Sequence, residues 1–284
     1  VLGVIPYLTD LHLPEEDGVT LDRIDVGRQG RLNIVVLYLP HISNFTDFDP
    51  LEHEPGVSLR YVRPGQRIGD ADVVILPGSK NTIDDLLFLK REGYAEEILD
   101  LWASGKKVIG ICGGFQMLGK KICDPLGVES SAGETAGLGL LDVATVLQRE
   151  KMTFQVKALS LFGPAAILEG YEIHMGETSR GSCARPAFRI TERLGTQMAQ
   201  EEGAISGDGR VWGTYLHGLF ENNGFRRGFI ESFVAVPGRR PSLAAEGFDY
   251  KEFKKREFDR LAVALRKALD FEGIYRIAGI QWPG

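Results

Sequence analysis

Residues 110–116 read Gly110-Ile111-Cys112-Gly113-Gly114-Phe115-Gln116, so a cysteine stands between glycines two places before it and two places after it. The preceding residues, 108–111, form a short apolar run typical of a buried strand, and the apolar side chains that follow are spaced as in a helix. Glycines on both flanks of a strand-to-helix turn are typical of a nucleophile elbow, because larger side chains would collide in so sharp a turn. The sequence therefore predicts that Cys112 projects from this turn as a nucleophile.

The position of Cys112 also favours a reactive thiol. Unpaired N–H groups at the start of a helix favour an anion, so we expect thiolate to form near neutral pH. The alternative is a buried and unreactive side chain, which is the usual state of a free cysteine. Cys123 and Cys183 lack the glycine frame and are expected to be structural.

A histidine farther along the chain is the candidate base. Residues 211–216 are rich in β-branched and aromatic side chains, as in a strand, and His217-Gly218 follows at the strand's end. An imidazole in that position can reach into a cleft, and a cysteine and a histidine so far apart in sequence meet only through the fold. Residue chemistry alone leaves open that His217 is a core or capping residue.

A second strand-to-helix turn supplies candidate hydrogen-bond donors. Residues 72–76 read as a buried strand with an apolar run at 73–76, and Pro77-Gly78-Ser79 turns the chain toward a helix. In a parallel sheet this turn and the elbow end on the same edge, where ligands bind in α/β proteins. The N–H groups of Gly113 and of Gly78 or Ser79 are therefore candidates for an oxyanion hole. An ordinary strand-to-helix turn would explain the same three residues.

The composition indicates an intracellular enzyme. With 284 residues and 43 % hydrophobic content, the chain can bury one large core. Its three cysteines are not spaced for a disulfide framework or a zinc site, so we expect no metal and a reducing cytoplasm. The longest apolar run, 34–39, is too short to cross a bilayer, and no signal-peptide pattern is seen. A net charge of −6 argues against nucleic acid and anionic membranes as partners.

Apolar patterning predicts an α/β fold. Strands alternate with helices in the first half of the chain, with strands expected near 33–39, 73–76, 108–111 and 140–146 and helices near 82–102 and 114–122. This βαβ alternation indicates a central, mostly parallel sheet with helices on both faces. Later strands without long helices between them suggest an antiparallel extension, near 171–176, 187–191 and 210–216. Helices are expected at 224–234 and, with an amphipathic stripe, at 250–269.

The ends of the chain differ from its middle. Residues 1–8 read like a buried strand with no partner preceding it. We therefore expect residues 1–30 to be the end of another domain plus a polar linker. The main domain is expected at 31–237, with a helical tail at 238–284.

Five segments together resemble one enzyme family, and they are residues 5–17, 76–82, 110–116, 170–176 and 213–220. On these segments the chain resembles the class I (triad) glutamine amidotransferases, and among them the cobyric acid synthase branch. The resemblance implies a flavodoxin-like class I amidotransferase fold. It also implies that glutamine's side-chain amide forms a γ-glutamyl thioester on Cys112, and that the released ammonia passes to an ATP-activated carboxylate.

The resemblance further implies partners and substrate contacts. Glutamine is the expected substrate, contacted by Gln116 and Ser79. In the family, residues 1–30 would close an N-terminal synthetase domain, where ATP and Mg²⁺ are expected, and no cofactor is expected in this chain. Through that domain the protein would amidate side-chain carboxylates of a corrinoid, converting adenosylcobyrinic acid a,c-diamide to adenosylcobyric acid in cobalamin biosynthesis.

One catalytic position departs from the wider family. The third triad member is normally a glutamate two residues after the histidine, but Leu219 stands there. The cobyric acid synthase branch resembles this chain in lacking that glutamate, so we expect a Cys112–His217 dyad, which a partly ionised thiol can sustain. The candidates for an orienting or substrate-contacting group are Glu172, His174 and Glu221.

Other functions stay open at this stage. Cobyrinic acid a,c-diamide synthase and the glutaminase partner of a ligase that amidates lipid II share the same chemistry and differ mainly outside this chain. A free-standing cysteine hydrolase of γ-glutamyl bonds would need no partner domain, which the strand-like residues 1–8 argue against. A catalytically inactive docking module is supported by Leu219 alone.

Overall fold

The described residues of the structure, a computed structural model, are 1–8, 11–13, 32–130, 133–163, 165–233 and 248–282. The chain divides into two compact units, residues 17–248 and residues 1–16 with 249–284, and each is described by itself. The predicted domain boundaries at 30/31 and 237/238, with the expected linker, fall outside the described residues and stay predictions.

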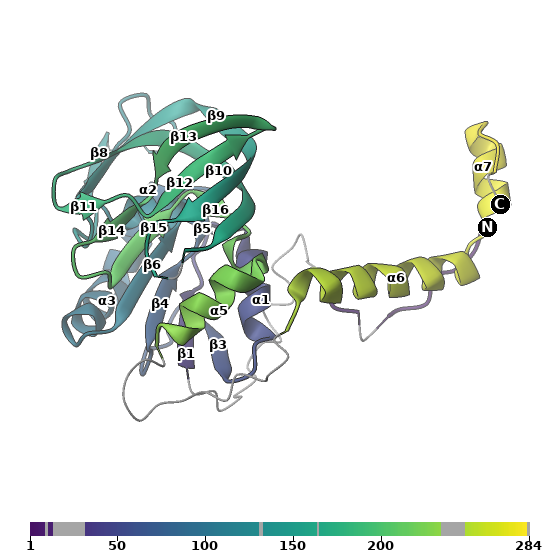
Figure 1. Cartoon of the computed structure of the whole chain (residues 1–284), viewed down its shortest axis with the longest axis horizontal. Coiled ribbons are helices and arrows are strands. Elements are labelled where there is room, and N and C mark those ends of the chain that lie inside the picture. The colour runs from purple at the N-terminus through teal and green to yellow at the C-terminus, as the bar shows by residue number, and fades with distance from the viewer. Residues whose placement is uncertain (9–10, 14–31, 131–132, 164, 234–247, 283–284) are drawn as a thin grey trace. The chain divides into compact units, whose positions relative to one another are not determined.

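Within the described residues, a seven-stranded sheet forms the centre of the larger unit, in the order β11-β14-β15-β6-β4-β1-β3 (Figure 1). The strands from β15 to β3 are parallel to their neighbours, whereas β14 and β11 pair antiparallel. Their bounds are β1 (Leu32–Leu37), β3 (Val57–Val62), β4 (Val73–Leu76), β6 (Lys107–Ile111), β11 (Ala184–Arg185), β14 (Ala204–Ser206) and β15 (Val211–Thr214). The central strand β4 is buried along its whole length, as expected for a parallel strand covered on both faces.

Each face of this sheet has its own hydrophobic core. In β1, Ile34 and Val36 belong to one buried cluster and Val35 and Leu37 to the other, because successive side chains point to opposite faces. One face is covered by α2 (Thr82–Arg91), α3 (Tyr94–Ala103) and α4 (Gly113–Leu118). The other is covered by the second sheet, by α1 (Asp49–Glu52) and α5 (Asn223–Glu231), and by the 3-10 helices η2 (Phe45–Phe48) and η3 (Leu219–Glu221). The predicted α/β architecture is confirmed.

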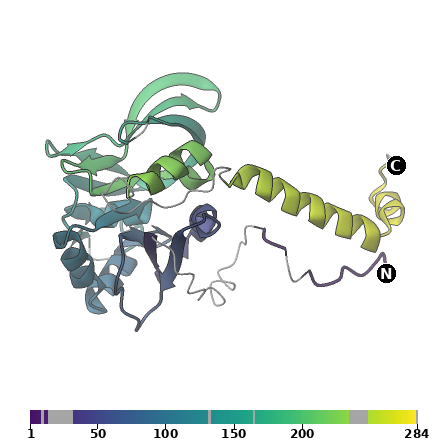
Figure 2. The same cartoon turned by 60° about the horizontal axis from the view of Figure 1, so that its bottom comes forward.

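A second sheet, mainly antiparallel, has the order β13-β12-β9-β10-β16 and lies at one side of the central sheet (Figure 2). Its strands are β9 (Val143–Ser160), β10 (Ile167–Arg180), β12 (Phe188–Arg193), β13 (Thr196–Glu202) and β16 (Leu216–His217). β7 (Lys121–Cys123) pairs with β9 and with β8 (Glu134–Ala136). A short antiparallel pair joins β2 (Ile42–Ser43) to β5 (Gly78–Ser79) and so links the loops that follow β1 and β4.

The structure corrects four details of the prediction. The strand expected at 140–146 is the start of β9 and belongs to the second sheet, while the parallel edge strand is β3, which was not predicted. The strand expected at 210–216 is not part of the antiparallel extension, because β15 pairs in parallel with β6. The helix expected at 82–102 is two helices, since Gly93 adopts a left-handed conformation between them. The helix expected at 114–122 ends at Leu118.

The smaller unit contains α6 (Tyr250–Ala268), α7 (Phe271–Ala278) and the N-terminal segment. The predicted helix at 250–269 is confirmed as α6. The side chain of Asp249 accepts a hydrogen bond from the Glu252 N–H, and Asp270 caps α7 in the same way. Among the helices of the described residues, none combines the length and the apolar character needed to cross a membrane.

Candidate active site

The turn after β6 has the geometry of the predicted elbow. Cys112 lies at φ 53° and ψ −111°, a conformation that non-glycine residues rarely adopt, and α4 begins at the next residue. A Cβ on Gly110 would lie 2.5 Å from the Gly114 carbonyl oxygen, and one on Gly114 would lie 2.0 Å from the Leu76 carbonyl oxygen. Both glycines are therefore required by the close approach of backbone to backbone.

Cys112 projects from this turn between the two sheets. Its backbone N–H donates to the Thr214 carbonyl of β15 at 2.8 Å. Its Sγ donates to the Ile173 carbonyl of β10 at 3.1 Å, and its side chain lies close enough to His217 to raise the pKa of the imidazole. The side chain is half-buried. The predicted nucleophile and the predicted base are thus brought together by the fold.

His217 is held at the end of β16 by a carboxylate that the sequence did not reveal. Asp47, from η2, places Oδ2 2.6 Å from His217 Nδ1, and its Oδ1 accepts the Gly218 N–H at 2.9 Å. Both side chains are buried, with 1 % of His217 and 7 % of Asp47 exposed. The pair has the geometry of an orienting acid and its histidine.

The charge of Asp47 changes the titration of His217. Burial alone lowers the pKa of His217, but the negative charge of Asp47 and its hydrogen bond outweigh burial, and the hydrogen bond with Cys112 adds to them. Together they raise the pKa of His217 to about 10. The imidazole therefore carries a proton at neutral pH in this arrangement.

The expectation of a dyad without an acid is wrong in this structure, because the carboxylate of Asp47 is hydrogen-bonded to Nδ1 of His217. Glu172 instead pairs at 2.8 Å with Arg193, and of the two side chains Glu172 is buried and Arg193 half-buried. His174 Nδ1 contacts the Gly176 carbonyl at 2.9 Å, its ring stacks on Tyr215, and burial lowers its pKa. Glu221 lies in η3.

The two predicted oxyanion loops meet beside the cysteine. A Cβ on Gly113 would lie 3.0 Å from the Ser79 nitrogen, and one on Gly78 would lie 3.7 Å from His217 Cε1. The Ser79 hydroxyl donates to Asp85 at 2.6 Å, so its side chain is engaged within the loop. The loops of Gly78-Ser79 and of Gly113 thus lie side by side. Their shared role as an oxyanion hole stays a prediction.

Gln116 is buried between α4 and β10, with 3 % of its surface exposed. Its Oε1 accepts from the Thr82 hydroxyl at 3.1 Å, and its Nε2 donates to the Met175 carbonyl at 3.2 Å and to the Tyr215 hydroxyl at 3.1 Å. A cavity of about 650 Å³ is lined by Phe115, Glu172, His174, Arg193 and Tyr215 among others, and neither Gln116 nor Cys112 is part of its lining. Gln116 thus braces the strand that contacts Cys112, and its contact with a substrate stays a prediction.

Comparison with known proteins gives the family. Residues 33–225 match the model of the CobB/CobQ-like glutamine amidotransferase domain. The chain belongs to this family. The match covers every residue described above for the site, including Asp47, Cys112 and His217.

Curated relatives of this amidotransferase domain are longer proteins. The chain is 49 % identical to the cobyric acid synthase of Thermoanaerobacter sp. strain X514 and 48 % identical to that of Caldanaerobacter subterraneus subsp. tengcongensis, over 98 % of this chain and 56 % of each relative. It is 44 % identical to the cobyric acid synthase of Syntrophobacter fumaroxidans over 99 % of this chain and 57 % of the relative. The chain therefore spans little more than half the length of these relatives.

Solved structures agree with the amidotransferase fold. The Thermotoga maritima PurLQS structure matches 72 % of this chain and 99 % of the matched chain, with a TM-score of 0.55 and 18 % identity. A structure described as a glutamine amidotransferase also matches 72 % of this chain and 99 % of its own chain, with a TM-score of 0.52 and 16 % identity. At such low sequence identities, the similarity to these two structures shows a shared fold and nothing more.

Three other features noted in the sequence are the two further cysteines, the possible metal ligands and the acidic residues 15–17. Cys123 is half-buried and Cys183 exposed, both as free thiols. In the portion of the chain that the structure describes, no three His, Cys, Asp or Glu side chains gather where they could hold a metal ion. The acidic residues 15–17 of the N-terminal motif lie outside the described residues.

Proposed function

We propose that this chain is the glutaminase part of a cobyric acid synthase. It hydrolyses glutamine through a thioester on Cys112 and supplies ammonia for the ATP-dependent amidation of corrinoid side-chain carboxylates. The observation that carries the glutaminase activity is the Cys112–His217–Asp47 arrangement at a nucleophile elbow. The name of the relatives, which match nearly all of this chain, supports the choice of synthase.

In the first half of the reaction, the Cys112 thiolate attacks the side-chain carbonyl carbon of glutamine. The resulting oxyanion is stabilised by the N–H of Gly113 and that of Gly78 or Ser79, which lie on the two meeting loops. His217 then donates its proton to the leaving nitrogen, the C–N bond breaks, and ammonia and the γ-glutamyl thioester form. The raised pKa of His217 supports this role, because the proton to be donated is already in place.

In the second half, water replaces the thiol. His217 accepts a proton from water as the oxygen attacks the thioester carbonyl, the C–S bond breaks, and glutamate leaves with Cys112 regenerated as thiolate. Asp47 holds the ring through Nδ1, so that the other ring nitrogen faces the reacting atoms, and stabilises the imidazolium.

The partners follow from the length of the relatives. This chain spans 56 % of the two most similar synthases named above, so ATP, Mg²⁺ and the corrinoid are assigned to the part of the protein that has no counterpart here. We also infer a cytoplasmic protein. Ammonia would pass from Cys112 to that second part, where an activated carboxylate accepts it.

The test is Cys112→Ser in the full-length protein that contains this chain. Glutamine-dependent amidation of adenosylcobyrinic acid a,c-diamide should be abolished, while amidation with free ammonium should continue at the wild-type rate, because only ammonia production needs the thiol. Products are followed by mass spectrometry. Near wild-type use of glutamine by the variant would overturn the nucleophile, and amidation of cobyrinic acid or lipid II in place of the diamide would overturn the choice of synthase.

A further inference from the structure

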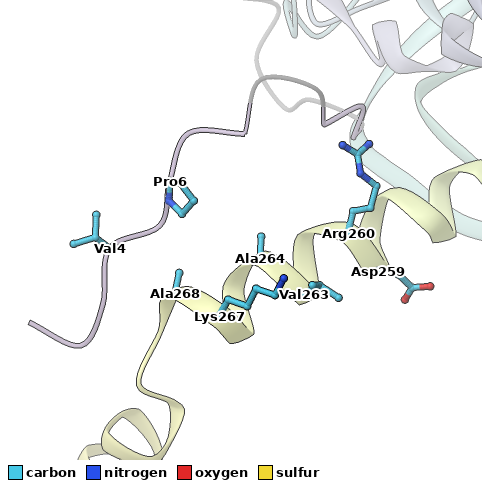
Figure 3. Close-up of a pocket in the computed structure, with 8 residues that line it drawn as sticks. All are labelled: Val4, Pro6, Asp259, Arg260, Val263, Ala264, Lys267 and Ala268. Atoms are coloured by element: carbon cyan, nitrogen blue, oxygen red, sulfur yellow. The ribbon is translucent and has the colours of Figure 1, made fainter.

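Ionisable side chains gather around one cavity of the larger unit. In the smaller unit, a cavity of about 770 Å³ between the N-terminal segment and α6 has a mainly aliphatic lining (Figure 3). The cavity of about 650 Å³ in the larger unit is lined instead by carboxylate and guanidinium groups from several strands. Glu202, the last residue of β13, is one of them and is buried, with 5 % of its surface exposed.

The carboxylate of Glu202 holds the chain where it crosses from one sheet to the other. β15 ends at Thr214 in the central sheet and β16 begins at Leu216 in the second sheet, so Tyr215 alone joins them. The Tyr215 N–H donates to Glu202 Oε1 at 2.7 Å, and the Thr214 hydroxyl donates to Oε2. The Thr214 hydroxyl oxygen in turn accepts the Leu216 N–H at 3.0 Å. One side chain therefore fixes all three residues of the crossing.

This crossing is connected to both members of the proposed catalytic pair. The Thr214 carbonyl accepts the Cys112 N–H at 2.8 Å, and His217 ends the short strand that follows the crossing. The turn before β14 packs closely against the same region, since a Cβ on Gly203 would lie 2.5 Å from the Gly213 carbonyl oxygen. A shift of the crossing would therefore move the thiol relative to the imidazole.

The ionised form of Glu202 is the one that fits these contacts. Both partners, the Tyr215 N–H and the Thr214 hydroxyl, donate to it. A carboxylate accepts on both of its oxygens, whereas a protonated carboxyl group or an amide has a donor in one of the two positions. Protonation of Glu202, or its replacement by glutamine, therefore weakens one of the two contacts.

Ionisation of Glu202 works against the stability of the fold. Burial raises the pKa of this carboxyl group to about 7, although the hydrogen bonds from Thr214 and Tyr215 lower it. In an unfolded chain the pKa is about 4.3, so the contribution of Glu202 to stability is fully present below that pH and is lost as the pH rises through about 7. Above about pH 7 the charge costs stability, and what it provides is the pair of contacts at the crossing.

Other ionisable groups face the same cavity. The negative charge of Glu172 raises the pKa of Glu202 further, and the positive charge of Arg180 lowers it. Both residues lie on β10, together with His174 and Glu177. The remaining charged groups of the lining come from β9, β12 and β13, and they are Arg149, Glu150, Arg193 and Glu201. A substitution at Glu202 leaves all of these groups in place, so a comparison with the wild type isolates Glu202.

We propose that Glu202 is a positioning residue of the glutaminase. Its carboxylate clamps the crossing from β15 to β16 and thereby holds Cys112 and His217 at the distance at which they react. It acts through Thr214 and Tyr215 and not through contact with the substrate. This inference rests on the proposed function, because the distance between thiol and imidazole matters for turnover only if the two act on glutamine.

Glu202→Gln in the full-length protein tests the clamp. We expect kcat for glutamate release to fall about 10- to 100-fold, as when reacting groups are displaced slightly. KM for glutamine should change by less than about twofold, because no group proposed to contact the substrate is replaced. Glu201→Gln is the matched control: its side chain is exposed and paired with Arg180, and it should leave kcat unchanged. Wild-type kcat in Glu202→Gln would overturn the proposal.

The difference between wild type and Glu202→Gln should also depend on pH. Above about pH 8 the wild-type carboxyl group is ionised, and the full difference in kcat is expected. Below about pH 6 it is protonated and, like the amide, has a donor in one position, so the ratio of the two rates should fall toward one. A ratio that stays constant over this range would indicate a purely structural role and overturn the clamp.

Thr214 offers a second test if circular dichroism shows that Glu202→Gln does not fold. Thr214→Val keeps the shape of the side chain but removes the hydroxyl group that donates to Glu202, whereas Thr214→Ser keeps that hydroxyl. We expect Thr214→Val to lose kcat as Glu202→Gln would, and Thr214→Ser to lose far less. Equal rates for the two Thr214 variants would contradict the clamp.

Alkylation of Cys112 by iodoacetamide separates a failure of the clamp from a failure of the proposed function. The imidazolium of His217 favours the thiolate, so a loosened crossing should raise the pH at which Cys112 becomes reactive, as followed by peptide mass spectrometry. If the wild type releases no glutamate but Glu202→Gln shows this rise, the proposed function is wrong and the clamp stands. If the wild type releases glutamate and the variant shows neither the rise nor a loss of kcat, the clamp is wrong and the proposed function stands.

Discussion

At the scale of single residues, the ring of His217 is fixed on several sides. Asp47 holds Nδ1 at 2.6 Å, and the Tyr171 ring stacks on the imidazole with centroids 5.1 Å apart and planes at 14°. The side-chain amide of Asn44, a residue in a left-handed conformation, packs against the ring, with Nδ2 3.1 Å from Nδ1 and 3.4 Å from Nε2. Local sequence predicted Cys112 and His217, because a glycine frame and a strand end are local signals, and the structure brings the two side chains together. Asp47 was missed because it lies 170 residues from His217, on a loop whose position only the fold sets.

The role of Asp47 is tested by Asp47→Asn. The amide has the shape of the Asp47 carboxylate but lacks its negative charge. The imidazolium of His217 therefore loses its stabilisation, and the neutral ring can adopt the wrong tautomer. Loss of the orienting acid lowers turnover about 10⁴-fold in serine proteases, and we expect about 10²- to 10⁴-fold here, because a thiol needs less activation. Glutamate release gives the rate. Glu221→Gln is the control and should retain most of the activity; a larger loss in the control than in Asp47→Asn would mean that the acid is misassigned.

The same pair predicts how stability depends on pH. The folded-state pKa of His217 is raised to about 10, above its unfolded value of about 6.5. Its contribution is therefore fully present below about pH 6.5 and is lost as the pH rises through about 10. Urea unfolding across this range should show the wild type losing more stability with rising pH than Asp47→Asn, which lacks the charge that raises the pKa. Parallel profiles for the two proteins would contradict the raised pKa.

At the scale of elements, the site depends on how tightly α4 packs on β4. Apolar runs and glycine spacing sufficed to predict β4, β6 and the elbow, because these are local patterns. The edge strand β3 was missed because its alternation of buried and half-buried residues is weaker than the continuous apolar runs of the central strands. The antiparallel pairing of β9 with β10 joins residues that are far apart in sequence. The sequence alone does not predict which residue of one strand lies opposite which residue of the other.

The elbow's packing is tested by Gly114→Ala. The added methyl would lie 2.0 Å from the Leu76 carbonyl oxygen, and backbone of a central strand cannot move aside as a flexible side chain would. We expect a loss of about 1–3 kcal/mol in the free energy of unfolding, as for overpacked cores, with a loss of glutaminase activity as α4 shifts. Gly224→Ala is the matched control. It lies in α5 with open space around it, so it should be neutral or stabilise the protein by up to about 1 kcal/mol. Equal stability of the two variants would show that the elbow tolerates a side chain.

At the scale of the whole molecule, the proposed catalytic residues come from different parts of the larger unit. Cys112 follows a strand of the central sheet, Asp47 follows the loop after β1, and His217 ends a strand of the second sheet. The carbonyl of Ile173, also from the second sheet, accepts from Cys112. The site is therefore assembled only when both sheets are packed together. A body that restrains the second sheet, or the loop that carries Asp47, can change the activity without touching the cysteine.

If the chain is part of a synthase, as proposed, this arrangement predicts that glutamine hydrolysis is coupled to the rest of that synthase. Ammonia released into water is diluted and mostly protonated, and hence unreactive toward a carboxylate derivative, so an efficient synthase keeps hydrolysis low until an activated acceptor is present. We expect the 284-residue chain alone to release glutamate slowly, and the full-length protein to do so several-fold faster with ATP and corrinoid bound. Asp47 already supplies an orienting acid to His217 within this chain. The increase should therefore appear in kcat, because the rest of the protein closes a site that is already assembled. It does not add a missing catalytic group. Glutamate release by the two proteins, measured at saturating glutamine, decides the matter: equal rates would make the chain a free-standing hydrolase.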